Sequence, residues 1–216
     1  MVLRKIPGHK PNPNNRKNQS VNEAHLAFIP LPHLFPPHPS GDIHRVVLAG
    51  FGFDESEQDL FNEGAENLNG AELKDTEKRK PNEEEGEPIA RLIKVENHYD
   101  DKFFKQFYSK SAKVWRSVTP IILSGFTRHG RTPEHLIYRA LNQIGIGNES
   151  IESIAVFRAP IVPKTFRSMQ YEIAKNDYLN QTPRYHAEII FKRPVRGVLV
   201  IGRGRHAGFG LMMPVD

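Results

Sequence analysis

The chain ends in an apolar, β-rich run that breaks into closely spaced glycines, and no other segment restricts the fold as strongly. Residues 195–214 read Val-Arg-Gly-Val-Leu-Val-Ile-Gly-Arg-Gly-Arg-His-Ala-Gly-Phe-Gly-Leu-Met-Met-Pro. Glycine permits positive φ and lets the main chain approach another group closely. A Walker loop or a dinucleotide-binding loop would open a helix, whereas here Pro214 follows within a few residues. The run therefore predicts either a loop that contacts phosphate groups or a tight structural turn between strands.

Basic residues alternate with these glycines and also stand on the strand before them. Arginine brings a forked set of donors that suits phosphate, and the loop glycines would allow close approach. We therefore expect contacts with the phosphates of a nucleic acid at the loop and at the segment that precedes it. The loop candidates are Gly202, Arg203, Gly204, Arg205, His206, Gly208 and Gly210, and the candidates before it are Lys192, Arg193 and Arg196.

Composition limits the class of protein. The 216 residues carry a formal net charge of +5, which suggests an acidic partner such as a polynucleotide. The absence of cysteine excludes a disulfide scaffold, thiolate catalysis and sulfur-ligated zinc. The apolar stretches are too short to span a membrane and the polar start lacks a signal-peptide core. We expect a cytoplasmic protein with no membrane partner and no cofactor.

Periodicity and turn signals predict an α+β domain over 25–216, preceded by a flexible basic arm over 1–24 and interrupted by a mobile charged loop over 69–88. Counted from Ile43, the elements follow the strand–helix–strand–strand–helix–strand order of a ferredoxin-like fold. We expect an added strand before this unit and a hairpin with the glycine-rich loop after it. The expected strands cover 25–32, 43–50, 89–95, 113–123, 151–158, 185–192 and 197–202, with helices after Asp54 and from Thr132-Pro133.

Four segments together resemble a known family. They are Ala24-His25-Leu26-Ala27-Phe28-Ile29-Pro30-Leu31-Pro32, Ser40-Gly41-Asp42-Ile43-His44-Arg45-Val46, Trp115-Arg116-Ser117-Val118-Thr119-Pro120 and the closing glycine-rich run. The last of these is similar to the terminal glycine-rich loop of the RAMP superfamily of CRISPR-associated proteins. The other three resemble successive blocks of the type I-U (or I-G) protein that fuses the fifth and sixth Cas subunits. The resemblance covers roughly His25 to the end, and it differs in lacking the family's N-terminal RAMP half.

The resemblance implies an RRM-like RAMP fold and a cytoplasmic endoribonuclease of antiviral defence. Such an enzyme cuts the CRISPR repeat transcript without metal and stays on the mature guide RNA (crRNA) with other Cas subunits of a type I interference complex. Two alternatives remain open. One is a non-catalytic crRNA-binding subunit of that complex, and the other is a general RNA-binding protein outside CRISPR biology.

Metal-free RNA cleavage needs a base for the 2′-hydroxyl, stabilisation of the phosphate charge and an acid for the leaving oxygen. Histidine suits both proton transfers, since its ordinary pKa is about 6.5. His25 and His44 lie at the starts of two expected strands in the matching blocks, and we take them as the catalytic candidates. The alternative is that one or both histidines have a structural role, capping a strand or forming hydrogen bonds with the backbone.

Other residues allow different interpretations. His33, His38, Asp42 and His44 contain metal-ligating groups, but the prolines between them favour a solvent loop, so we expect no metal site. A structural role is expected for His186, and a core position for Trp115 and the aromatic stretch from Phe103 to Tyr108. Lys164, Arg167 and Lys175 mark a second candidate RNA-facing loop.

Overall fold

The computed structural model describes residues 25–35, 37–51, 53–74, 88–95, 98–127, 130–171, 173 and 179–215. Contacts divide the chain into two compact units. The larger unit consists of Ala27–Ala49 and Asp101–Asp216, and the smaller holds Gly50–Asp100 with the start of the first strand. The predicted basic arm over 1–24 lies outside the described residues, so its boundary stays a prediction.

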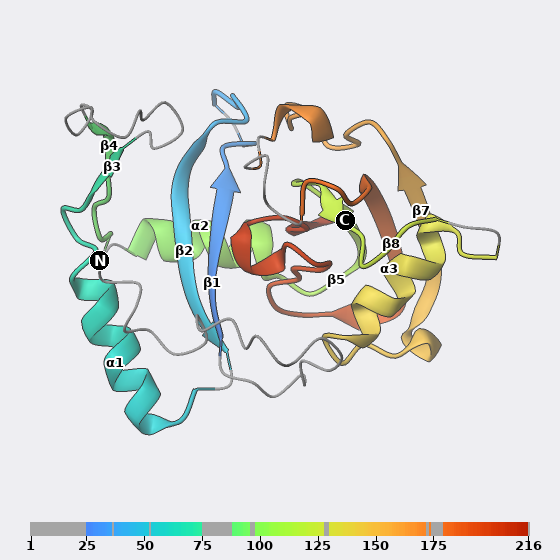
Figure 1. Cartoon of the computed structure of the whole chain (residues 1–216), viewed down its shortest axis with the longest axis horizontal. Coiled ribbons are helices and arrows are strands. Elements are labelled where there is room, and N and C mark those ends of the chain that lie inside the picture. Colours follow the sequence, from blue (N-terminus) through green and yellow to red (C-terminus); the bar gives the residue numbers. More distant parts are fainter. Residues whose placement is uncertain are drawn as a thin grey trace. The chain divides into compact units, whose positions relative to one another are not determined.

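A five-stranded sheet forms the centre of the larger unit (Figure 1). Strand β8 (Arg184–Val195) is the longest and lies between β7 (Ile151–Phe157) and β5 (Ala112–Ser117). Strand β9 (Met212–Val215) pairs with the free side of β5, and the short β6 (Ile121–Ile122) continues beside β8 after a bend. All of these pairings are antiparallel.

One face of the sheet is covered by α3 (Pro133–Asn142), which lies against the β7–β8 side (Figure 1). Thr132 caps the helix by accepting a hydrogen bond from the amide of His135, and proline takes the tolerated first position. The apolar face of the helix meets alternate residues of β5 and β8, among them Trp115, which is fully buried. This cluster confirms the predicted core position of Trp115.

A second apolar cluster joins the hairpin of β1 (His25–Pro32) and β2 (Ile43–Phe51) to the helix α2 (His98–Tyr108). Alternate β1 residues Ala27, Ile29 and Leu31 are buried, as one face of a half-covered strand requires. The aromatic side chains Phe104, Phe107 and Tyr108 enter the same cluster. The predicted core role of that aromatic stretch is confirmed for these three residues.

The smaller unit contains α1 (Glu55–Glu66) and the hairpin of β3 (Glu72–Lys74) and β4 (Pro88–Arg91). Asp54 and Glu57 form a capping box that fixes the start of α1, and the hydrogen bonds lower the pKa of Asp54. Residues 75–87, most of the predicted charged loop, lie outside the described residues. Three short 3₁₀ turns, Asn148–Ser150, Ser168–Gln170 and Arg205–Ala207, complete the described elements.

The chain is α+β, as predicted, but the strands are grouped differently. The strands counted from Ile43 were expected in one sheet, whereas β2 pairs with β1, β4 pairs with β3, and β5 and β7 both flank β8. Sequence order gives the succession of strands and leaves their partners undetermined. Helix α2 and strands β3 and β9 were not predicted, and the expected strand over 197–202 contributes only the single bridge of Val200 to Leu211. None of the described helices is long and apolar enough to cross a bilayer.

Candidate functional site

His33 and His44 meet where β1 and β2 enter their connecting loop. The loop between the strands closes tightly, because the His33 amide donates to the Asp42 carbonyl at 2.8 Å and the Gly41 amide donates to the His33 carbonyl at 2.9 Å. These bonds bring the two imidazole rings edge to face, with centroids 5.9 Å apart. His44 is exposed and His33 is half-buried. At this separation, one phosphate group can form hydrogen bonds of about 3 Å with both rings.

A strained turn supports this hairpin loop. Gly41 has φ +82°, and a Cβ there would lie 2.0 Å from the carbonyl oxygen of Lys164. Lys164 itself has φ +68°, an uncommon conformation for a residue with a side chain. The turn is held by Thr165, whose hydroxyl donates to the Val162 carbonyl at 2.7 Å. Lys164, a residue of the predicted second RNA-facing loop, is therefore beside the turn that aligns the histidines, while Lys175 lies outside the described residues.

The end of α2 anchors the same hairpin. The buried hydroxyl of Tyr108 donates a 3.0 Å hydrogen bond to the carbonyl oxygen of Pro32, the residue before His33. Phe35 stacks on Phe107 with ring centroids 3.6 Å apart. Burial raises the pKa of the Tyr108 phenol above its ordinary value, so this phenol stays protonated and serves as a donor.

The glycine-rich loop owes its glycines to internal packing. All four loop glycines are buried, and a Cβ on any of them would meet protein atoms at less than 3 Å. The nearest approach for Gly210 would be 1.8 Å, to the Ile201 carbonyl oxygen, and Gly208 would meet Pro30 of β1 at 2.4 Å. These contacts explain Gly202, Gly204, Gly208 and Gly210 without a ligand, and contact of this backbone with RNA stays a prediction.

The loop's basic side chains have three different environments. Arg203 is exposed, while its amide donates to the Ile122 carbonyl at 2.9 Å. Arg205 is half-buried and donates from its guanidinium to the Gly202 carbonyl at 3.4 Å, which ties it to the loop. His206 is half-buried. Of these three RNA-binding candidates, Arg203 offers the most accessible side chain.

Two of the basic residues before the loop, Lys192 and Arg193, lie on a bulge of β8, and Arg196 directly follows the strand. Ile190 pairs with Val114 and Val195 pairs with Ala112, so four residues of β8 stand opposite Lys113 alone. Such a bulge turns side chains away from the ladder. Lys192, Arg193 and Arg196 are all exposed, and no hydrogen bond or ion pair joins them to another described residue. These three candidates are available to a ligand.

The structure places a third histidine beside one of the two predicted catalytic histidines. His44 was paired with His25 in the catalytic prediction, whereas the structure brings His33 to it. His25 begins β1, and its side chain lies outside the described part of the chain, so its role stays a prediction. The Ser40-Gly41-Asp42 turn was the signal that could have identified His33, since a tight turn joining two strands brings their ends together.

The hairpin loop and the start of β2 also carry the four residues of the alternative metal-site interpretation. Among the described residues, no three histidine, aspartate or glutamate side chains are grouped as ligands of one ion. His33, His38, Asp42 and His44 therefore do not converge, although two of the four are neighbours.

His186 is a fully buried residue of the central strand β8. Its Nδ1 lies 3.2 Å from the Ser117 hydroxyl, which also accepts a hydrogen bond from the Ala187 amide at 2.9 Å. Its Nε2 has no hydrogen-bond partner among the described residues. Burial lowers the pKa of His186, which keeps the ring neutral. This environment agrees with the structural role expected for His186.

Comparison of the chain with protein-family models, with curated protein sequences and with solved structures finds no match.

Proposed function

We propose that this protein is a metal-independent endoribonuclease that binds CRISPR repeat RNA and cuts it to produce guide RNA. The observation that carries the proposal is the His33–His44 pair, with ring centroids 5.9 Å apart on a braced hairpin. One imidazole would accept the proton of the ribose 2′-hydroxyl and the other would protonate the leaving 5′-oxygen. The 2′-oxygen then attacks the phosphorus, the P–O5′ bond breaks, and a 2′,3′-cyclic phosphate forms.

The accessible cations support RNA as the substrate. Lys192 and Arg193 lie on the β8 bulge, Arg196 directly follows the end of the strand, and all three side chains are exposed. Phosphate contacts of this kind supply most of the affinity of a protein for nucleic acid and make it depend on salt.

The strand order supports the RAMP-like part of the proposal. Across the sheet the strands run β7, β8, β5, β9, and α3 connects β5 to β7 along the chain. Numbered along the chain as β5, β7, β8 and β9, they stand in the order 2-3-1-4, which is that of a ferredoxin-like β-α-β-β-α-β unit. In this scheme the glycine-rich segment takes the place of the second helix. The match rests on different strands from those first assigned from the sequence.

The test is cleavage of a labelled repeat RNA by the purified chain in EDTA, beside substrates with one 2′-deoxy substitution at each position. The proposal expects one cut site, lost on a single deoxy substitution and on His44→Ala. His25→Ala and His33→Ala, assayed in parallel, decide which histidine acts with His44.

A different result would favour the second candidate. Tight repeat binding without cutting by the wild-type chain would indicate a non-catalytic crRNA-binding subunit of a cytoplasmic type I complex. Equal binding of the repeat and an arbitrary hairpin would indicate a general RNA-binding protein. If the wild-type chain neither binds nor cuts the repeat RNA, the assignment of RNA as its substrate is wrong.

A further inference from the structure

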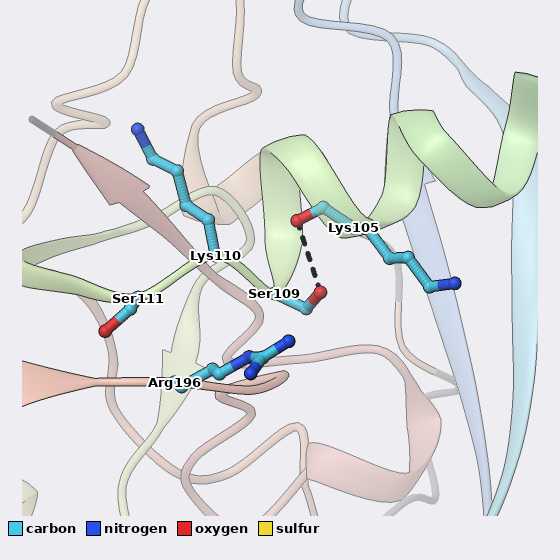
Figure 2. A pocket seen from close by; sticks show the side chains of 5 residues that line it. All are labelled: Lys105, Ser109, Lys110, Ser111 and Arg196. Atoms are coloured by element: carbon cyan, nitrogen blue, oxygen red, sulfur yellow. Dashed lines mark hydrogen bonds between the residues drawn. The ribbon is translucent and has the colours of Figure 1, made fainter.

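A basic pocket lies where α2 ends and β5 begins (Figure 2). Its volume is about 460 Å³, within the range of pockets that hold small molecules. Five residues line it, Lys105, Ser109, Lys110, Ser111 and Arg196, and none of them is acidic. The lining thus includes three cations and two hydroxyls, and all of its residues except Arg196 were absent from the site predicted from the sequence.

The pocket is built by contacts between distant parts of the chain. The Gly197 amide donates to the Ser109 carbonyl at 3.3 Å, which fastens the end of β8 to the end of α2. Next to it, Ala112 of β5 pairs with Val195 of β8. Arg196 is therefore held between two backbone contacts, because Val195 before it pairs with Ala112 and the amide of Gly197 after it donates to Ser109. Figure 2 shows its side chain running beneath the Ser109 end of α2, with Lys105 and Lys110 extending to either side.

The hydrogen-bonding groups of the lining suit a ligand that accepts hydrogen bonds. Ser109 already donates its hydroxyl proton to the Lys105 carbonyl at 3.2 Å, which covers one carbonyl at the negative end of the helix. The Ser111 hydroxyl and the Arg196 guanidinium have no bond to another described residue. The Arg196 guanidinium and the Ser111 hydroxyl can donate hydrogen bonds to the oxygens of a phosphate group, and Lys105 and Lys110 add positive charge to the lining.

We propose that this pocket binds a backbone phosphate of the RNA strand, at a position separate from the phosphate that is cut. The inference rests on the RNA-binding function proposed above. Arg196 contacts two of the phosphate oxygens through its planar donors, Lys105 and Lys110 supply the remaining charge, and Ser111 donates one further hydrogen bond.

The position of the pocket gives this phosphate a role in placing the substrate. Ser109 of the lining directly follows Tyr108, and Tyr108 donates to the carbonyl of Pro32, next to His33. One tyrosine side chain therefore links the pocket wall to the histidine pair. A strand held at both points has its register fixed relative to the histidines, as accurate cleavage at one site requires.

The test compares salt dependence of RNA binding. Single-stranded repeat RNA with a fluorescent label is titrated with wild-type protein, Arg196→Gln and the double variant Lys105→Gln/Lys110→Gln at several salt concentrations. We expect Arg196→Gln to bind about tenfold more weakly, and the slope of log affinity against log salt to become less steep by about 0.7 for each lost contact. Lys102→Gln on the same helix and Arg139→Gln on α3 are matched controls, exposed and outside the pocket, and should keep the wild-type slope.

The outcomes separate this inference from the proposed function. Wild-type slopes in the pocket variants, with wild-type RNA binding intact, would overturn the pocket and leave the proposed function standing. Failure of the wild-type chain to bind RNA would overturn both. In a second experiment the protein is titrated with inorganic phosphate while the amide NMR signals of Ser111 and Gly197 are monitored. If these signals shift with free phosphate but the protein does not bind RNA, the pocket is a site for small anions and the RNA assignment is rejected.

Discussion

Tyr108 donates a 3.0 Å hydrogen bond to the carbonyl oxygen of Pro32, and this buried contact joins helix α2 to the end of β1, next to His33. The two residues are far apart in sequence, and each stands beside a candidate site. Pro32 precedes the half-buried His33, and Tyr108 precedes Ser109 of the basic pocket. The bond is therefore a stabilising contact, and it also holds the two parts of the proposed RNA-binding surface, the basic pocket and the histidine pair, in register.

Tyr108→Phe should lower the free energy of unfolding by about 0.5–1.5 kcal/mol, or up to about 3 kcal/mol if the buried Pro32 carbonyl finds no new partner. The ring and its packing are retained, so the loss reports the hydroxyl alone. Urea unfolding followed by circular dichroism measures it. Tyr138→Phe on α3 is the matched control, a half-buried tyrosine, and should change stability by less than about 0.5 kcal/mol. Equal stability of the Tyr108→Phe variant and the wild type would show that the bond adds nothing.

His44→Ala and His33→Ala should each reduce the rate of RNA cleavage by about 10²- to 10⁴-fold, because each removes one proton-transfer group. Single-turnover cleavage with excess protein measures the rate, and RNA affinity measured beside it should stay close to that of the wild type. His135→Ala, an exposed histidine on α3, is the control and should leave the rate unchanged. Full activity of both His33→Ala and His44→Ala would remove the pair from the mechanism.

The buried His186 should make the protein sensitive to acid. Burial lowers the pKa of His186 in the folded chain, while the unfolded chain has the ordinary value of about 6.5. Below that pH the unfolded chain binds a proton that the folded chain does not, so the free energy of unfolding decreases as the pH falls. Above about pH 6.5 this contribution is constant.

Urea unfolding between about pH 5 and about pH 8 tests this expectation. His186→Gln should flatten the acid branch of the stability curve, whereas His135→Gln, in which the replaced ring is exposed, should retain it. An acid branch of the same steepness in His186→Gln would assign the sensitivity to another group.

Gly210→Ala should destabilise the fold by more than the strain of a positive φ alone, which is about 1–3 kcal/mol. Gly210 has φ +75°, and an added Cβ would lie 1.8 Å from the Ile201 carbonyl oxygen. Gly145→Ala separates the two effects, because Gly145 has φ +83° but nothing within 4 Å of an added Cβ. Thermal unfolding of both variants should place Gly210→Ala well below Gly145→Ala. Equal melting temperatures would mean that the loop adjusts and that its close packing is not required.

Local patterns gave correct predictions where the local signal was strong. Thr132-Pro133 marks the start of α3, Asp54 caps α1, and the alternation around Trp115 identifies a strand with one buried face. The sequence did not predict helix α2, because its apolar residues are aromatic and closely spaced, a pattern that occurs in both helices and strands. In the structure this stretch is a helix because its aromatic side chains can then pack together against the β1–β2 hairpin.

The candidate site was predictable only in part. The sequence identified His44 and the basic residues at the end of β8, because imidazole and charged groups are recognisable by residue type alone. The loop glycines were recognised as a group, but the reason for them is different: they are needed where the chain contacts Pro30, Ile122 and its own carbonyls. A glycine that makes room for a ligand and one that makes room for the protein look the same in a sequence.

The sequence by itself determined the α+β class, the strands and helices with clear periodicity, and the residue types available for chemistry. These properties depend on side-chain pattern within a few residues. Only the tertiary structure decided which strands share a sheet, that His33 lies beside His44, and that Lys105, Lys110 and Arg196 line one pocket. Such pairings depend on packing between segments far apart in the chain, and a single sequence carries no local record of which segments meet.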